Sequence, residues 1–509
     1  MFVTINTVSL TGLDGTIIEV QTDISNGVIA FDIIGLPDAT VREARDRAKA
    51  SIKNCGCDFP RKRITMNLAP SSIKKEGSGF DLAITLAILA ASAQINIDDA
   101  EHTVFIGELA LDGSVKPVHG VLPMVISAYE KGIKRCFVPE QNAEEAAVIS
   151  GIDIYPLSHL SDAIDFFCGT NNIKPYKTDL EAIEASRIVS ALDMRDVKGQ
   201  EHAKRAIEIA ASGLHNVLMS GPAGTGKSML AKRMSTILPD MTFDEMLEVT
   251  KLHSIAGTLP SNVPIITERP FRDPHHTVSA TALSGGGAVP RPGELSLAHC
   301  GVLFLDELPE FHRDALEVLR QPLEDGIITI SRVNATLSYP CNIMLIAAMN
   351  PCPCGNLGNP KRMCTCTPHQ IQRYRAKISA PLLDRIDIQI EVPHIRYDDL
   401  SALPQGDSSA EIKERVNRAR KVQLSRYENE SITFNSQLTA PMLDKYCQLG
   451  DAESKLLRAA FDRLGLSARA HSKILKVART IADLDGFDDI KSSHIAEAIQ
   501  YRNLDRKQY

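Results

Sequence analysis

The chain has 509 residues, of which 44% are hydrophobic and 23% are charged, and its formal net charge is −7. This length predicts two or three domains, and this composition is typical of a soluble globular protein. The negative charge excludes a general attraction to nucleic acid, so any such binding must be local.

The N-terminus has acidic side chains and lacks a basic start followed by a long apolar run, so no signal peptide is expected. No window reaches the ~18 uninterrupted apolar residues that a membrane span needs. The cysteines number 11, and an odd count on an unsecreted chain argues against a disulfide framework and for a reducing compartment. The sequence therefore predicts a cytoplasmic protein that does not bind membranes.

Short apolar strands alternate with helical stretches in residues 1–165, where Leu82–Ala91 has the pattern of a buried helix and Val104–Leu109 that of a strand. A polar segment around Pro175 is a candidate linker. From Val197 onward the order is helix, strand, glycine-rich turn and helix, which begins an α/β unit. The sequence therefore predicts five segments: an α/β domain over 1–170, a linker over 171–195, an α/β core over 196–395, a linker helix over 396–435 and a helical lid over 436–509.

A glycine-rich loop lies between the apolar strand at 216–220 and a following helix. Its sequence is Gly221-Pro222-Ala223-Gly224-Thr225-Gly226-Lys227-Ser228. This fills the phosphate-loop pattern, whose glycines let backbone N–H groups face phosphates at the positive end of a helix. Lys227 is expected to neutralise the β and γ phosphates of ATP, and Ser228 to bind Mg²⁺. The alternative, a chance glycine turn, is disfavoured by the full match in this context.

A second buried strand, residues 301–305, ends in Asp306 and Glu307. Four consecutive apolar residues are typical of a parallel strand covered on both faces, and ligands bind at the carboxyl edge of such sheets. Asp306 is expected to hold Mg²⁺, directly or through water, and Glu307 to polarise the attacking water. Alone, such a strand end is also typical of an exposed cap. Together with the phosphate loop it predicts a site for ATP hydrolysis.

A third apolar strand, residues 342–349, ends in Asn350. An amide at this position can orient the water near the γ-phosphate, which is the sensor 1 role. The alternative is an ordinary turn asparagine.

Four cysteines follow this strand within fifteen residues, namely Cys352, Cys354, Cys364 and Cys366. Two close pairs of thiolates suit tetrahedral Zn²⁺, and four protein ligands would make the ion structural. The C-x-C spacing is tighter than the usual C-x₂-C, so buried free cysteines or a redox pair remain alternatives. His369 is close enough in sequence to replace one thiol.

The overlapping segment 361–377 contains five cations and no acid. Such a patch suits contacts to DNA phosphates, although a solvated face or an intersubunit surface explains it equally well. The 411–427 segment mixes basic and acidic residues, which favours an exposed amphipathic helix.

These elements, in this order, resemble those of AAA+ ATPases. Four further motifs are similar to those of the YifB/ComM family of magnesium chelatase-like ATPases, and the resemblance extends over almost the whole chain. They are Arg272-Asp273-Pro274-His275-His276, Gly285-Gly286-Gly287, Pro292-Gly293-Glu294-Leu295-Ser296-Leu297-Ala298-His299 and Asn350-Pro351-Cys352-Pro353-Cys354-Gly355.

The resemblance implies a P-loop core, in which a parallel sheet has helices on both faces, followed by a helical lid. It also implies an insert in the glycine-rich region around Gly285, and a second hairpin at about 326–341. In related motors both project into a central pore. His275 and His276 have only one acid, Asp273, close by, so a structural or pore-loop role is expected for them rather than metal binding.

Two arginines complete the site by resemblance. Arg385 lies in a segment that looks like the arginine-finger segment of chelatase-like motors, and would reach the γ-phosphate of the neighbouring subunit. Arg469 lies in a segment similar to the sensor 2 motif. The fixed fork of an arginine stabilises charge spread over phosphate oxygens, whereas a surface salt bridge is the alternative. A finger acting in trans requires a ring, and a homo-hexamer is the family expectation.

The N-terminal part resembles the catalytic domain of Lon proteases, an α/β fold of the ribosomal S5 domain 2 type. The catalytic serine and lysine positions of that domain fall on Gly79 and Leu122, so an active protease is not expected. A rearranged dyad of Ser78 and Lys116 is the alternative. A platform for ring assembly or DNA engagement is the expected role.

The resemblance as a whole implies an ATP-dependent DNA helicase or translocase that uses ATP and Mg²⁺. Its expected work is branch migration in homologous recombination and natural transformation, with branched or single-stranded DNA and recombination proteins as partners. The alternatives are the motor subunit of a magnesium chelatase and a protein-remodelling ATPase.

Overall fold

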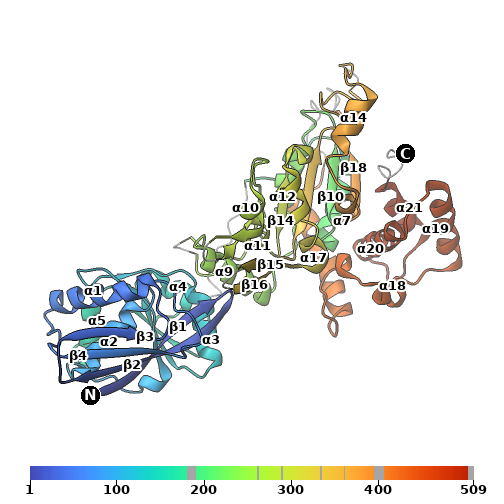
Figure 1. Cartoon of the computed structure of the whole chain (residues 1–509). Coiled ribbons are helices and arrows are strands. Elements are labelled where there is room, and N and C mark those ends of the chain that lie inside the picture. Colours follow the sequence, from blue (N-terminus) through green and yellow to red (C-terminus); the bar gives the residue numbers. More distant parts are fainter. Residues whose placement is uncertain are drawn as a thin grey trace. The chain divides into compact units, whose positions relative to one another are not determined.

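The computed structural model describes residues 1–179, 191–260, 263–287, 290–332, 335–359, 362–394 and 406–502. The chain forms two compact units (Figure 1). The first consists of Met1–Arg187 and Met246–Thr267, and the second of Ile188–Glu245 and Glu268–Tyr509. Met246–Thr267 therefore belongs to the N-terminal unit, although the sequence-based boundaries put it in the second α/β core. None of the described helices is long and apolar enough to cross a membrane.

The N-terminal unit contains a seven-stranded mixed sheet with the order β3-β4-β2-β1-β5-β8-β9. The pairs β1/β2 and β2/β4 are antiparallel, and the other neighbouring pairs are parallel. The strands are β1 (Phe2–Thr11), β2 (Asp14–Ser25), β3 (Ala30–Ile34), β4 (Arg63–Ala69), β5 (Thr103–Phe105), β8 (Arg135–Pro139) and β9 (Asp153–Leu157).

Two hydrophobic cores flank this sheet, because successive side chains of a strand point to opposite faces. Val104 lies in one core and Phe105 in the other. The first core includes α3 (Val121–Glu130) and α4 (Ala143–Ala146); the second includes α1 (Ala39–Asn54), α2 (Asp81–Ala91) and α5 (Leu160–Phe167). All residues of α2 are buried, as its apolar pattern predicts. The predicted strand over Val104–Leu109 is divided into β5 and β6 (Glu108–Leu109), which pairs with β7 (Val115–Lys116).

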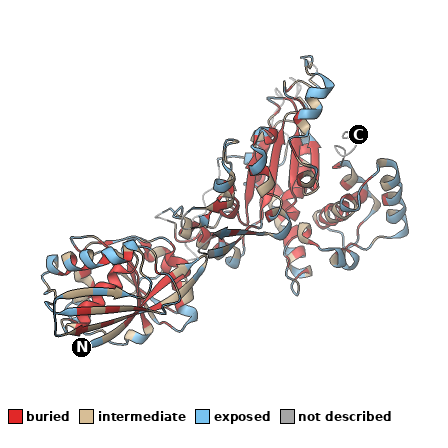
Figure 2. Ribbon diagram, viewed as in Figure 1, coloured by how far each residue is buried: buried red, intermediate tan, exposed pale blue. Residues whose placement is uncertain are grey.

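The second unit contains a five-stranded sheet with the order β11-β14-β17-β10-β18, and all its neighbouring pairs are parallel. Helices cover both faces, so its central strands are fully buried (Figure 2). This confirms the predicted parallel α/β core. The strands are β10 (Val217–Ser220), β11 (Phe271–Arg272), β14 (Val302–Leu305), β17 (Met344–Met349) and β18 (Ile388–Glu391).

One face of this sheet shares a hydrophobic core with the P-loop helix and the helical lid. The contributing helices are α7 (Glu201–Gly213), α8 (Lys227–Met234), α17 (Ser409–Arg426), α18 (Ala440–Tyr446), α19 (Asp451–Leu464), α20 (Ala468–Leu484) and α21 (Ser492–Gln500). The lid is also held by charge, since Lys473 Nζ lies 2.8 Å from Asp387 Oδ1. Burial alone would raise the pKa of Asp387, but Lys473 and His215 lower it well below its usual range.

Two small hairpins stand where the resemblance implies them. One is β12 (Gly285–Gly286) with β13 (Arg291–Pro292), and the other is β15 (Ile327–Arg332) with β16 (Ala335–Pro340). They contact each other, because the Tyr339 hydroxyl donates to the Pro290 carbonyl at 3.1 Å. The remaining helices are α9 (Phe243–Ala256), α10 (Ala280–Ser284), α11 (Glu294–Leu297), α12 (Arg313–Val318), α13 (Pro322–Asp325), α14 (Pro368–Arg375) and α15 (Ala380–Leu383).

Candidate active site

The glycine-rich loop follows the carboxyl end of β10 and leads directly into α8. Gly224 and Gly226 adopt the left-handed conformation, with φ of 77° and 88°, which a residue with a Cβ rarely adopts. Gly226 is the N-cap of α8, so the loop lies at the positive end of this helix. The Gln200 side chain donates to the Thr225 carbonyl at 2.6 Å and steadies the loop. The predicted curled backbone is therefore present.

Lys227 is the first residue of α8, and its side chain is 8% exposed. Its ammonium donates to the carbonyl oxygens of Gly221 and Pro222 at 2.7 and 2.9 Å. Burial lowers the pKa of Lys227, while Asp306 and Glu307 oppose that shift. The lysine charge is thus held on the loop carbonyls and interacts favourably with the acids that follow β14.

Ser228 and Asp306 meet at the magnesium position that the sequence predicts. The Ser228 hydroxyl donates to Asp306 Oδ2 at 2.5 Å, although the two residues are 78 positions apart. The Glu307 backbone N–H donates to the other carboxylate oxygen at 2.9 Å. A hydroxyl and a carboxylate side by side fit Mg²⁺, which binds oxygen and is held by one or two protein ligands plus phosphates. These residues would hold the ion, which would neutralise charge developing on the phosphates.

Asn350 completes the cluster from the end of β17, which lies between β14 and β10. Its Oδ1 accepts a hydrogen bond from Lys227 Nζ at 3.4 Å. The structure therefore brings Lys227, Ser228, Asp306, Glu307 and Asn350 together at one edge of the sheet. This is the geometry that the sensor 1 interpretation requires.

Arg385 and Arg469 lie away from this cluster. The Arg385 carbonyl accepts from Asn216, which precedes the amino end of β10, whereas the P-loop follows the carboxyl end. The Arg385 guanidinium donates to the carbonyls of Arg320 and Pro381 at 2.8 and 2.7 Å. It also pairs with Glu324. The structure thus holds Arg385 at the opposite end of the strand from its own P-loop.

Arg469, at the start of α20, pairs with the residue that precedes Arg385. Its Nη1 lies 2.8 Å from Asp384 Oδ2, and its side chain is 67% exposed. The two predicted arginines therefore belong to one region of the second unit.

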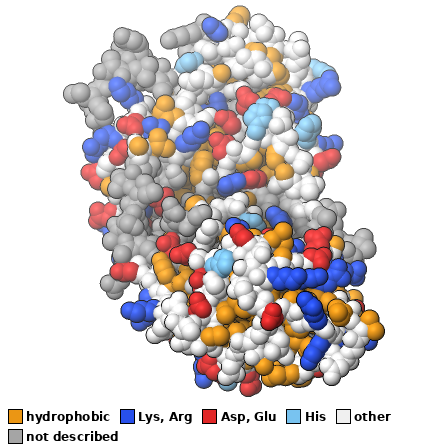
Figure 3. Space-filling model, turned by 90° about the vertical axis from the view of Figure 1, so that its left-hand side faces the viewer, with side chains coloured by type: hydrophobic (Ala, Val, Ile, Leu, Met, Phe, Trp, Pro, Cys, Tyr) orange, Lys and Arg blue, Asp and Glu red, His pale blue; other side chains and the backbone are white. Residues whose placement is uncertain are grey.

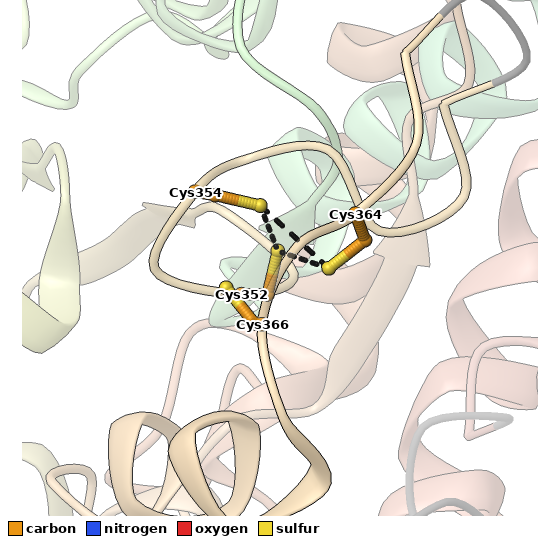
Figure 4. A group of neighbouring side chains, drawn as sticks. All are labelled: Cys352, Cys354, Cys364 and Cys366. Carbon is orange, nitrogen blue, oxygen red and sulfur yellow. Dashed lines mark hydrogen bonds between the residues drawn. The ribbon is translucent and has the colours of Figure 1, made fainter.

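The four cysteines of the loop after β17 converge (Figure 4). Their sulfur atoms all lie within 4.8 Å of one another. The Cys352–Cys354 and Cys352–Cys364 sulfur separations are 3.4 and 3.6 Å. Tetrahedral zinc with bonds of ~2.3 Å needs sulfurs ~3.8 Å apart, so the set fits Zn²⁺. Backbone N–H groups of Asn356 and Thr365 lower the pKa of Cys354 to about 5, whereas desolvation and the neighbouring thiols raise the pKa values of Cys364 and Cys366.

The fourth member of this set is Cys366, not His369. All four thiols are free of disulfide bonds. The arrangement therefore fits a metal site with four thiolate ligands.

Ser78 and Lys116, the residues of the alternative protease dyad, both lie next to Glu108 in the N-terminal unit. The Ser78 hydroxyl donates to the Glu108 carboxylate, and Glu108 lies opposite Lys116 in the β6–β7 pair. Leu122 is fully buried. Among its described hydrogen bonds, Ser78 therefore contacts an acid and no lysine base.

One residue beside the site was missed by sequence reasoning. His276, for which a structural or pore-loop role was expected, lies 3.8 Å from Glu307. The signal that could have found it is the position of its motif immediately after β11, because the ends of neighbouring parallel strands meet at one edge.

Three family models match the chain. The one described as magnesium chelatase, subunit ChlI, matches residues 193–400, and its C-terminal counterpart matches residues 406–502. A third, described as subunit ChlI of Mg-chelatase, matches residues 20–142.

Two similar proteins cover nearly the full length of the chain, and a third covers a part of it. Competence protein ComM of Haemophilus influenzae is 42% identical over 499 residues, which is 97% of this chain and 96% of that protein. The protein YifB of Escherichia coli is 42% identical over 505 residues, or 99% and 97% of the two chains. The magnesium-chelatase 67 kDa subunit of Chlorobaculum parvum is 29% identical over 160 residues, or 31% and 23%.

Proposed function

This chain belongs to the YifB/ComM family of magnesium chelatase-like AAA+ ATPases, and from that premise we propose that it is a ring-forming motor acting on DNA. ATP hydrolysis would drive translocation and promote branch migration during homologous recombination and natural transformation. The single observation that carries the ATPase part is the convergence of Lys227, Ser228, Asp306 and Asn350 at one sheet edge. Lys227 would bind the phosphates, and Glu307 would polarise the attacking water.

Two observations support the proposal that the motor acts on DNA: the share of the chain that each relative matches, and the two hairpins. The competence protein ComM matches 97% of this chain, whereas the magnesium-chelatase 67 kDa subunit matches 31%. The part of the chain that is similar to both proteins suits any motor of this class. Because ComM alone of the two also matches the rest of the chain, the comparison favours the competence-type role. The two hairpins that contact each other also suit a motor that grips a polymer in a pore.

The basic segment 361–377 adds less support than its composition suggested. Lys361 lies outside the described residues. Arg375 donates to the Pro351 carbonyl at 3.3 Å, and Lys377 pairs with Glu310 at 3.2 Å. On the face in Figure 3, basic and acidic side chains are interspersed. On the face shown, DNA attraction would therefore come from local groups rather than from a broad basic surface.

A four-way DNA junction with one labelled strand tests this proposal. The full chain with Mg²⁺ and ATP is expected to convert the junction into duplex products, and a non-hydrolysable ATP analogue is expected to support none. Lys227→Ala is the control for contaminating helicases. Vigorous ATP hydrolysis without conversion of junctions or forks would contradict the DNA role. Turnover stimulated by a porphyrin-metallating partner would then favour the chelatase role.

The four cysteines are proposed to hold one structural Zn²⁺. Purified protein is expected to carry about one zinc per chain, measured by mass spectrometry of the metal. The double variant Cys364→Ser, Cys366→Ser should lose the metal and unfold at a lower temperature, because its loop loses its cross-link. Cys168→Ser, which removes an exposed thiol of the N-terminal unit, is the control. Protein free of zinc but equally stable and active would contradict the assignment.

The hexameric state, the recombination proteins as partners and the cytoplasmic location remain predictions.

A further inference from the structure

The segment after β11 reaches the catalytic edge of the sheet. β11 is the edge strand beside β14, and Arg272 is in register with Leu303. The chain therefore leaves β11 near the point where β14 delivers Asp306 and Glu307. Arg272 fixes this exit, because its Nε and Nη2 contact both carboxylate oxygens of Glu294 at 2.6 and 2.8 Å.

The ring of His276 is restrained on two sides. It lies against the ring of His275, with centroids 4.1 Å apart and planes inclined by 35°. Phe311 contacts it edge-on, with centroids 6.4 Å apart at 75°. His275 is fixed in turn by its Nδ1 contact to the Thr277 hydroxyl at 2.9 Å. In this orientation, Nδ1 of His276 is 3.8 Å from Glu307 Oε2.

The Glu307 carboxylate needs such a restraint. Its backbone is in the left-handed region, with φ of 54°, at the start of the 3-10 turn Leu308–Glu310. Its side chain is 53% exposed. Within the described ranges, no Lys, Arg or His nitrogen other than Nδ1 of His276 lies within ion-pairing distance of this carboxylate. A carboxylate that rotates freely spends little time aligned with an attacking water, and misalignment of a catalytic group is costly in rate.

We propose that His276 is a positioning residue that holds the carboxylate of Glu307 toward the attacking water. This inference rests on the proposed role of Glu307 in ATP hydrolysis. Its described contact at this site is to Glu307, and it acts through that residue. It therefore affects the chemical step and leaves nucleotide binding to the P-loop.

His276→Ala is expected to lower kcat for ATP hydrolysis about tenfold while KM and the Kd for a fluorescent ATP analogue change less than about twofold. The matched control is His102→Ala, which removes another histidine paired with a carboxylate. His102 Nδ1 lies 2.6 Å from Asp99 in the N-terminal unit. The His102→Ala variant should leave kcat for ATP hydrolysis unchanged.

Two amide variants separate positioning from mere space filling. Asparagine places an amide near the position of Nδ1, whereas glutamine places it near Nε2. His276→Asn should therefore recover most of the lost kcat, and His276→Gln should recover little. Equal kcat in His276→Ala and the wild type, or equal recovery by both amides, would overturn the proposal.

Glu307→Gln distinguishes failure of this inference from failure of the proposed function. If His276 acts through Glu307, His276→Ala should add nothing to the loss caused by Glu307→Gln. Full additivity of the two losses overturns the positioning role alone. Normal hydrolysis by Glu307→Gln itself would instead overturn the proposed catalytic site, whatever His276 does.

Discussion

Lys227→Ala is expected to lower kcat/KM for ATP hydrolysis by about 10²–10³-fold. The lysine ammonium donates to the P-loop carbonyls of Gly221 and Pro222, and alanine removes the charge that would neutralise the phosphates. Weaker binding of a fluorescent ATP analogue should accompany the loss. Steady-state phosphate release measures the first effect and fluorescence titration the second.

The matched control is Lys413→Ala on α17. It removes a lysine that forms an ion pair with Asp240 at 3.0 Å, a contact of little expected energy. Its ATPase activity should equal that of the wild type. Retention of hydrolysis by Lys227→Ala at more than about half the normal rate would contradict the phosphate-binding role.

Arg385→Ala is expected to lower kcat on the order of 10³-fold with little effect on nucleotide binding. Arg385 lies near the amino end of β10, whereas the P-loop of the same protomer follows the carboxyl end of that strand. Arg385 therefore cannot serve the ATP site of its own protomer in this conformation. A trans role requires the guanidinium to leave Glu324 and the carbonyls that now accept its hydrogen bonds. Phosphate release and analogue binding, measured on the same preparation, separate the two effects.

Mixing the two inactive variants tests the ring directly. A mixed ring contains interfaces that join the P-loop of an Arg385→Ala subunit to the arginine of a Lys227→Ala subunit. Random assembly makes about a quarter of the interfaces intact, so that share of activity should return. An Arg385→Ala variant that is fully active alone, or a mixture that stays inactive under conditions where subunits exchange, would contradict the finger assignment.

The second α/β core was predictable because its signals are local. The P-loop pattern lies within eight residues, and the apolar runs before Asp306 and Asn350 identify strands that must be buried on both faces. Parallel strands share a carboxyl edge, so convergence of these side chains follows from the strand pattern alone. The hydrogen bond between Ser228 and Asp306 shows this convergence most directly.

Other features depend on contacts between distant segments, which local patterns do not specify. Met246–Thr267 packs with the N-terminal unit through pairs such as Ser254 and the buried Glu145, 109 positions apart, at 2.8 Å. The cysteine spacing indicated a metal site but left the fourth ligand open, since the folding of the loop decides between Cys366 and His369. The place of His276 beside Glu307 depends on the β11–β14 register.

The central claim is that Lys227, Ser228, Asp306 and Glu307 act on one triphosphate. A crystal structure of the full chain with Mg²⁺ and a non-hydrolysable ATP analogue tests it most directly. The account predicts Mg²⁺ held by the Ser228 hydroxyl and the phosphates beside Asp306, with Lys227 Nζ on the terminal phosphates. A triphosphate bound away from the Gly221–Ser228 loop, or Mg²⁺ remote from Asp306, would contradict it.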